Sequence, residues 1–231
     1  MDVVEEKRNA AKYALSFVPS KGTVGIGTGS TVKFLIDLIG ENREYYGEAN
    51  FVPTSKETEN RLREFGLNIA YNFRGKIMID IDGADEVDPQ GNLIKGGGGA
   101  LTREKIVAHN SEEFVVIADS GKYVQRLGKF KLPIEILPFL AEQTISNIEN
   151  LGAKVNLRDN GEFKTDNGNL IAIADFGYIS DPEIVSQQLS HIPGIVEHGL
   201  FIKMATRSIE GHGNSVREHV YLKKKGEGHN Q

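Results

Sequence analysis

The sequence predicts an α/β protein in which a larger domain with a parallel sheet carries a smaller α+β domain. Three observations lead to this prediction: apolar strand-like runs alternate with amphipathic segments up to Ala118, a glycine-rich turn joins the first such run to a helix, and the pattern changes between residues 128 and 199. The length of 231 residues suits one large or two smaller domains.

The first part of the chain alternates helices with strands. Apolar residues at helical spacing between Val3 and Val18 predict an opening helix, which Pro19 and Gly22 end. The next predicted elements are strands at 23–26, 50–53, 67–70, 77–81 and 113–118, and helices at 32–39, 57–65 and 100–110. This alternation indicates a Rossmann-like parallel sheet with both faces covered.

The middle segment has the β-α-β-β-α-β order of a ferredoxin-like domain. Its predicted strands are 134–137, 154–157, 170–176 and 194–198, and its helices are 139–151 and 181–190. Asp-Asn-Gly at 159–161 and again at 166–168 suits positive φ near a hairpin tip.

We therefore expect two domains. A Rossmann-like catalytic domain is predicted at 1–127 plus 200–231, and a ferredoxin-like domain, which we expect to carry oligomer contacts, at 128–199. Within the first domain, 200–204 is expected to return to the sheet, and 223–231 to form a solvated tail.

The composition excludes several classes of protein. Hydrophobic residues make up 39% and charged residues 26%, as in ordinary globular proteins, and the net charge of −5 argues against a nucleic-acid partner. The absence of cysteine excludes thiolate nucleophiles and thiolate metal sites. Because neither a signal-peptide pattern nor an apolar run of about 20 residues is found, we expect a cytoplasmic enzyme without a membrane partner.

The loop between the first strand and its helix is a candidate phosphate site. Thr28, Gly29, Ser30 and Thr31 place hydroxyls and free backbone N–H groups at the positive end of a helix dipole. The loop lacks the Gly-Lys-Ser/Thr ending of a P-loop, and Ser30 breaks the Gly-x-Gly-x-x-Gly spacing. A tight strand-to-helix turn would explain the loop equally well on its own.

Acids follow the strand 77–81, where ligand crevices open in parallel sheets. Asp82 and Asp85 enclose Gly83 and Ala84, and two such acids can perturb each other's pKa and take separate roles. The alternative is an acidic turn, which Glu86 and Asp88 fit well.

A lysine then precedes four consecutive glycines. Lys95 could neutralise a developing oxyanion, and the amides of Gly96, Gly97 and Gly98 add donors, although a flexible linker with a solvated lysine is the alternative. Glu104 alone indicates only a first-turn acid that stabilises a helix. Glu104 becomes a candidate catalytic base because the glycine run should bring the first turn of the helix beside Asp82 and Lys95. A carboxylate there could abstract a proton next to a carbonyl.

Six motifs together resemble ribose-5-phosphate isomerase, type A. They are Gly-Ile-Gly-Thr-Gly-Ser-Thr at 25–31, Asp-Gly-Ala-Asp-Glu at 82–86, Lys-Gly-Gly-Gly at 95–98 followed by Ala-Leu-Thr-Arg-Glu-Lys at 100–105, Ala-Asp-Ser-Gly-Lys at 118–122, Thr-Asp-Asn-Gly-Asn at 165–169 and Ile-Pro-Gly-Ile-Val at 192–196. The resemblance implies interconversion of ribose 5-phosphate and ribulose 5-phosphate in the pentose phosphate pathway. It also implies a homodimer or homotetramer that needs no metal or cofactor.

The resemblance also implies residue roles. Glu104 would move a proton between C2 and C1 through a cis-enediolate, while Asp82 and Lys95 assist ring opening and steady the charged oxygens, with support from Asp85. The implied substrate-binding residues are Thr28, Gly29, Ser30, Thr31, Gly83, Ala84, Gly96, Gly97, Gly98, Lys122 and Lys7. For Lys7 the residues themselves favour a solvated helix face.

No metal site is expected, because the six histidines are scattered and none lies in the acid-rich segment. Segment 205–219 is more polar than the return strand and hairpin usual in the family. Three rival readings stay open: a sugar-phosphate sensor without catalysis, a related isomerase-deaminase or CoA transferase with a nucleophilic glutamate, and an oligomer-forming scaffold.

Overall fold

The computed structural model describes residues 2–221, so the predicted tail at 223–231 lies outside the described residues. Its helices are α1 (Val3–Ala14), α2 (Ser30–Glu41), α3 (Lys56–Glu64), α4 (Leu101–His109), α5 (Ala141–Glu149) and α6 (Pro182–Ser190). Its strands are β1 (Lys21–Ile26), β2 (Glu48–Pro53), β3 (Asn68–Ile69), β4 (Ile77–Asp82), β5 (Glu86–Val87), β6 (Leu93–Ile94), β7 (Ser111–Asp119), β8 (Leu132–Ile136), β9 (Lys154–Leu157), β10 (Leu170–Asp175), β11 (Ile195–His198), β12 (Leu200–Phe201), β13 (Arg207–His212) and β14 (Ser215–Val220).

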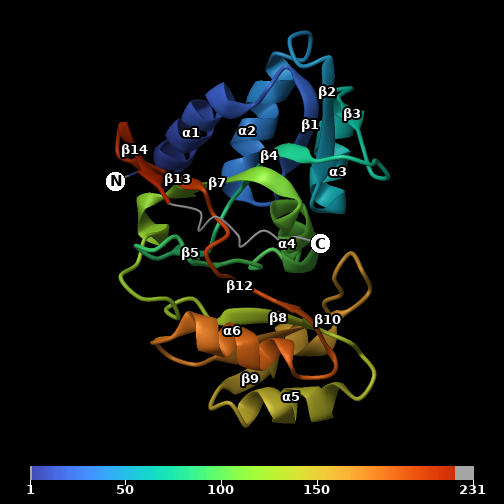
Figure 1. Ribbon diagram of the computed structural model, residues 1–231, viewed down its shortest axis with the longest axis vertical. Helices are drawn as coiled ribbons and strands as arrows, with labels where there is room; N and C mark the ends of the chain where they lie inside the picture. Colours follow the sequence, from blue (N-terminus) through green and yellow to red (C-terminus); the bar gives the residue numbers. More distant parts are fainter. Residues whose placement is uncertain (1, 222–231) are drawn as a thin grey trace, which may run out of the picture.

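The first lobe is a seven-stranded sheet with helices on both faces. Its strand order is β14-β13-β7-β4-β1-β2-β3, and every neighbouring pair is parallel except β13 with β14. Helices α1, α2 and α3 share the core on one face, whereas α4 packs against β4 and β7 on the other (Figure 1). The predicted α/β class is confirmed.

The central strand β4 is buried on both faces, and its side chains alternate between them. Ile79 and Ile81 enter the hydrophobic core beneath α1 and α2, so Asp80 and Asp82 project to the α4 face. The carboxyl end of β4 is therefore fixed by packing on both faces, and both of its acids lie on the same side of the sheet.

The second lobe is a four-stranded antiparallel sheet with α5 and α6. Its order, β11-β8-β10-β9, is what the predicted β-α-β-β-α-β succession produces in a ferredoxin-like fold. Asp181 caps α6 by accepting a hydrogen bond from the Ile184 amide, with Pro182 in the first turn. Asp159 and Asn160 adopt the predicted positive φ, at 48° and 52°.

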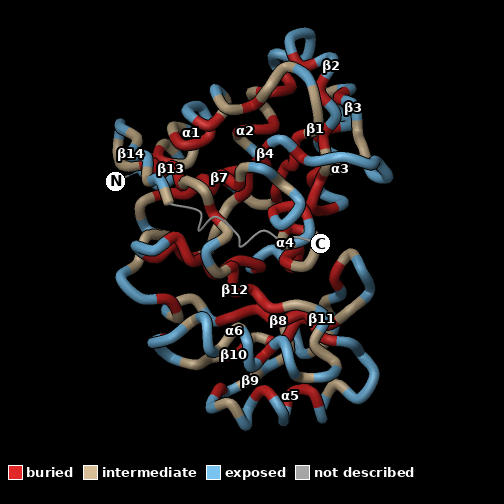
Figure 2. Tube along the Cα trace, in the orientation of Figure 1, coloured by how far each residue is buried: buried red, intermediate tan, exposed pale blue. Residues whose placement is uncertain are grey.

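The prediction for 200–204 is wrong. Leu200 and Phe201 form β12, which pairs with β6 in a small three-stranded sheet with β5, and the chain rejoins the large sheet only at β13, parallel to β7. The cause is that Gly199 is held at the junction of the lobes, where its amide donates to Pro133 O and its carbonyl accepts from Lys95 N. The buried segments in Figure 2 include β12 and β8, where the lobes meet.

Strand β8 is buried on both faces and links the two lobes. Leu132, Ile134 and Ile136 belong to the core with α5 and α6, while Glu135 projects toward the first lobe. The fully buried Glu135 carboxylate accepts hydrogen bonds from Thr102 Oγ1 of α4 and from the side chains of Thr165, Asn167 and Asn169. One carboxylate therefore fixes the loop 158–169 and α4 to the same strand. Within residues 2–221, each helix is too short or too polar to span a bilayer.

We predict that Glu135→Gln destabilises the protein, because the amide loses the charge and one of the two acceptor oxygens that four donors share. Hydrogen bonds to charged groups contribute about 1.5–3 kcal/mol each, so a loss of about that size in the free energy of unfolding is expected from urea titration. The matched control is Glu149→Gln on the exposed face of α5. Equal stabilities of the two variants would contradict the prediction.

Candidate active site

The predicted site residues meet in a cavity of about 120 Å³ at the carboxyl ends of β1 and β4. The residues that line it are Lys7, Thr28, Gly29, Ser30, Thr31, Gly83, Ala84, Asp85, Lys95, Gly96, Gly97, Gly98, Glu104 and Lys122. Asp82, which is fully buried, lies behind Lys95. All fifteen residues named from the sequence are thus brought together.

Asp82 is fixed by the backbone around it. Its Oδ1 accepts hydrogen bonds from the amides of Thr28 (3.0 Å) and Gly83 (2.7 Å), and its Oδ2 lies 2.9 Å from Lys95 Nζ. The side chain fills the space beside Gly27, where a Cβ would stand only 1.8 Å from Asp82 Oδ1. Burial raises the pKa of Asp82, against the opposing effects of Lys95 and the two amides.

Lys95 is the buried cation of the site. Its Nζ lies 2.9 Å from Asp82 Oδ2 and 3.3 Å from Glu104 Oε2, and it donates a 2.6 Å hydrogen bond to the Gly83 carbonyl. Burial alone would lower the pKa of Lys95, but the carboxylates of Asp82 and Glu104 outweigh it and raise the pKa above its ordinary value. Lys95 therefore stays charged, with a fixed position.

Glu104 lies in the first turn of α4, beside Lys95. Ala100 begins this helix without a side-chain cap, and the carboxyl of Glu104 is 3% exposed. Burial, and then the negative charge of Asp82, raise its pKa to about 8, although Lys95 opposes both. A carboxyl with a pKa near neutrality is suited to accept and return a proton.

Asp85 holds the glycine-rich loop. Its Oδ2 accepts a 2.8 Å hydrogen bond from the Gly97 amide, and a Cβ on Gly97 would stand 2.7 Å from its Oδ1. Arg158, from the second lobe, donates to the Gly97 carbonyl at 3.1 Å. The backbone at Gly97 is thus held from both lobes.

The part of the cavity beside the first turn of α2 contains a lysine. Ser30 and Thr31 stand in the first turn of α2, whose cap residue Gly29 has a φ of 124° and supplies no side chain. Lys7 on α1 donates to Ser30 Oγ at 3.0 Å and lies 4.0 Å from Asp119. Lys122 is a second lysine that lines the cavity. Lys7 therefore faces the cavity, although the residues alone favoured a solvated helix face.

The sequence did not single out several residues around the site. The Thr28 hydroxyl hydrogen bonds with those of Thr54 and Ser55, and Arg158 reaches Gly97, yet none of these contacts has a sequence signal. Asp80 did leave a signal, since a charged residue stands inside an otherwise apolar strand.

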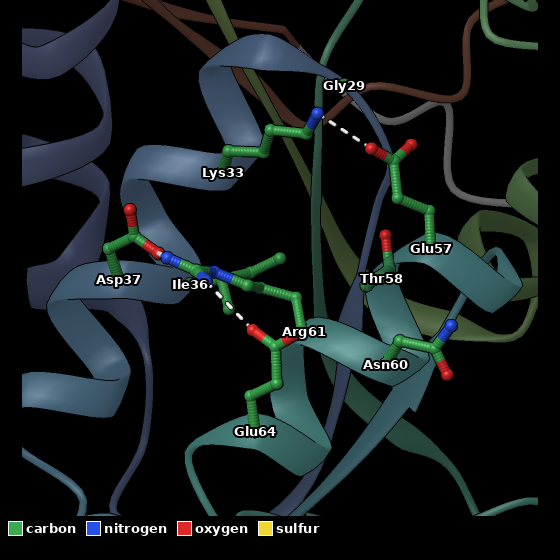
Figure 3. A pocket seen from close by; sticks show the side chains of 9 residues that line it. All are labelled: Gly29, Lys33, Ile36, Asp37, Glu57, Thr58, Asn60, Arg61 and Glu64. Atoms are coloured by element: carbon green, nitrogen blue, oxygen red, sulfur yellow. Dashed lines mark hydrogen bonds and ion pairs between the residues drawn. The ribbon is translucent and has the colours of Figure 1, made fainter.

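A larger depression of about 360 Å³ lies between α2 and α3. Its two cationic side chains are already paired: Lys33 with Glu57 at 2.7 Å, and Arg61 with Asp37 and Glu64 at 2.7 and 2.8 Å (Figure 3). These ion pairs link α2 to α3. The unusual cluster of buried ionisable side chains lies in the smaller cavity instead.

Among residues 2–221, no group of three or more metal-ligating side chains is placed to hold a metal ion. The buried histidine, His198, lies near Ser186, Ser190 and the Lys105 ammonium, and burial, assisted by Lys105, lowers its pKa to about 4.

Comparison with known proteins gives a consistent set of relatives. The family model of ribose 5-phosphate isomerase A (phosphoriboisomerase A) matches residues 50–215. Ribose-5-phosphate isomerase A of Picrophilus torridus is 50% identical over 206 residues, 89% of this chain and 93% of that protein, and the Thermoplasma volcanium protein of the same name is 42% identical over 232 residues, 96% of this chain and 95% of that protein.

Two solved structures are similar over almost the whole chain. A D-ribose-5-phosphate isomerase in complex with phospho-erythronic acid has a TM-score of 0.91 at 38% identity, covering 95% of this chain and 100% of that one. Ribose 5-phosphate isomerase A from Neisseria gonorrhoeae has a TM-score of 0.89 at 36% identity, covering 95% of this chain and 98% of that one.

The raised pKa of Glu104 predicts that stability falls as the pH rises. In the unfolded chain the carboxyl loses its proton near pH 4.5, whereas the folded protein keeps it to about pH 8. Between these values the folded state binds more protons, so this part of the stability is fully present below pH 4.5 and is lost as the pH rises through about 8. Because Glu104→Gln cannot titrate, we expect its urea midpoint to vary less over this range than that of the wild type.

Glu149→Gln, which removes an exposed carboxyl, serves as the control and should keep the slope of the wild type. If the stability curve of Glu104→Gln ran parallel to both of these, Glu104 would not be the group that titrates.

Proposed function

The chain belongs to the ribose 5-phosphate isomerase A family, and from this premise we propose how its cavity interconverts D-ribose 5-phosphate and D-ribulose 5-phosphate. The observation that carries the proposal is the position of one buried ammonium, that of Lys95, between the carboxyls of Asp82 and Glu104. The cationic end formed by Lys7 and Lys122 completes a cavity suited to an oxygen-rich anion.

In the proposed reaction Glu104 is the base. Its carboxylate takes the proton from C2 of the open-chain aldose, the C2 electron pair forms a C1–C2 double bond, and the carbonyl oxygen at C1 becomes the negative oxygen of a cis-enediolate. The hydroxyl proton on the C2 oxygen then passes to the C1 oxygen, which moves the negative charge to the C2 oxygen. Return of the carbon-bound proton from Glu104 to C1 re-forms a carbonyl at C2, which gives the ketose. A single carboxyl with a pKa of about 8 can serve both transfers, and no atom is gained or lost.

Lys95 is proposed to stabilise the enediolate. The negative charge moves between the oxygens on C1 and C2, and a permanently charged ammonium beside the proton acceptor would lower the energy of both positions. Asp82 fixes that ammonium and assists ring opening, while Asp85 accepts the hydrogen bond of the Gly97 amide and so fixes the glycine-rich loop beside the substrate. Because the ammonium is already in place, no rearrangement is needed as the enediolate forms, and this lowers the activation free energy.

The phosphate is proposed to bind at the α2 end. A phosphate monoester carries a charge of about −1.5 to −2 near neutral pH and requires several donors. The first-turn amides of α2, the hydroxyls of Ser30 and Thr31, Lys7 and Lys122 supply them. Thr28, Gly83, Ala84, Gly96 and Gly98 also line the cavity, and we propose that they surround the sugar carbons.

From the family resemblance we also propose the pathway, the cellular location, the cofactor requirement and the oligomeric state of the protein. The reaction belongs to the non-oxidative branch of the pentose phosphate pathway, takes place in the cytoplasm, and needs no metal or cofactor. The chain works as a homodimer or homotetramer, with a catalytic domain at 1–127 plus 200–231 and a ferredoxin-like domain at 128–199.

The decisive test is turnover of ribose 5-phosphate by purified protein in excess EDTA, with Glu104→Gln beside the wild type. We expect robust turnover in the wild type, and loss of about 10²–10⁴-fold in kcat in the variant with little change in substrate affinity, since only the proton acceptor is removed. Glu149→Gln is the matched control and should retain full activity.

Near-normal turnover by Glu104→Gln would remove Glu104 from the mechanism. A wild-type protein that binds ribose 5-phosphate without converting it would instead indicate a sensor of sugar phosphates. Activity that a divalent ion restores after chelation would contradict the proposed metal independence.

A second prediction concerns the phosphate end. Lys7→Met should raise KM for ribose 5-phosphate, and Ki for inorganic phosphate, by about tenfold each, corresponding to about 1.4 kcal/mol for a lost charge-assisted contact. Lys12→Met, on the exposed side of the same helix, is the control. An unchanged Ki for phosphate in Lys7→Met would place the phosphate elsewhere in the cavity.

A further inference from the structure

Asp80 is a buried acid to which the proposed reaction assigns no role. It stands in the middle of β4 and is 0% exposed, and neither of its carboxyl oxygens has a hydrogen-bond partner among the residues that the structure describes. A charged carboxylate in that setting is strongly unfavourable, because it has lost its hydration without gaining a donor.

Among residues 2–221, the surroundings of Asp80 offer its carboxyl no hydrogen-bond donor. Its partners on the neighbouring strands are Gly25 of β1 and Phe114 of β7, neither of which titrates. A Cβ on Gly25 would stand 2.7 Å from Asp80 Oδ1 and 2.5 Å from Cγ1 of Val107 on α4, so the carboxyl is enclosed between the sheet and that helix.

The charged groups that act on Asp80 are those of the active site. Asp82 lies two residues ahead on the same face of β4, Lys95 follows β6, and Glu104 projects from α4. Burial first, and then the negative charge of Asp82, raise the pKa of Asp80 well above its ordinary value, while Lys95 opposes the shift only in part.

Three carboxyls therefore share one ammonium, and they are not equivalent. Asp82 accepts two backbone hydrogen bonds and contacts Lys95, Glu104 contacts Lys95, and Asp80 has neither kind of partner. Of the three carboxyls, Asp80 is the one that protonation stabilises most, because it has no donor of its own.

We propose that Asp80 is a positioning residue that holds a proton beneath the Asp82–Lys95 pair throughout the working pH range, and that its ionisation at alkaline pH slows the isomerisation proposed above. An ionised Asp80 would place a second negative charge behind Lys95. That charge would weaken the attraction of the ammonium for the enediolate and oppose ionisation of Glu104. Asp80 does not touch the cavity and acts through its neighbours.

The pH profile of kcat/KM for ribose 5-phosphate tests the proposal. The wild type should give a rising limb, as Glu104 ionises near pH 8, and a falling limb at higher pH from Asp80. Asp80→Asn keeps the shape and neutrality of the protonated acid, so we expect neutral-pH activity within about threefold of the wild type and no falling limb. Asp80→Ala, smaller and equally unable to titrate, is the second variant and should also lose the falling limb.

Asp37→Asn, which removes an acid in the depression between α2 and α3, is the matched control and should keep the falling limb. A falling limb that survives in Asp80→Asn or Asp80→Ala would overturn the proposal. So would a large loss of neutral-pH activity in Asp80→Asn, because it would show that the enzyme requires the ionised or proton-donating acid.

Infrared spectroscopy tests the proton directly and requires no turnover. Wild-type protein labelled with carboxyl-¹³C aspartate should show the shifted carbonyl band of a protonated aspartic acid at neutral pH, and the band should be absent from Asp80→Asn. If no such band is present in the wild type, Asp80 is ionised and the proposal fails, whether or not ribose 5-phosphate is the substrate. If the band is present but the wild type does not turn over, the proposed function fails and the assignment of the proton stands.

Discussion

The burial of the Lys95 ammonium is the constraint on which the site depends. A cation removed from water requires oxygen acceptors at short distance, and the carboxyls of Asp82 and Glu104 supply them at 2.9 and 3.3 Å. The same contacts place a fixed positive charge beside a carboxyl whose pKa is about 8. The same cluster of charged side chains therefore contributes to the stability of the fold and to the proposed chemistry. The strands and loops around the cluster exclude water from it.

Both lobes take part in holding this cluster. The amide of Lys95 donates to the Gly199 carbonyl, whose own amide donates to Pro133 in β8, so the backbone under the lysine is tied to the second sheet. Phe201 adds an aromatic ring whose centroid lies 5.5 Å from Lys95 Nζ and 4.9 Å from Lys105 Nζ. The second lobe therefore forms part of the wall of the site.

Periodicity was enough to predict the parallel sheet and the antiparallel second sheet, whereas the full set of residues that line the cavity followed from the motifs together with the family resemblance. They failed where the structure depends on few residues or on distant contacts. Strands β5, β6 and β12 have two residues each, too few to show alternation, and the position of Gly199 depends on Pro133 and Lys95, far away in sequence. Lys7 could not be assigned from its own helix because its partner, Ser30, belongs to another.

The side chain of Asp82 limits which residue can stand at position 27. The φ of Gly27 lies outside the left-handed region, so the turn itself would accept a larger residue. What excludes one is the carboxyl of Asp82, 1.8 Å from any added Cβ. The two positions are therefore sterically coupled: a side chain at 27 would collide with the Asp82 carboxyl, and only a shorter residue at 82 would leave room for one.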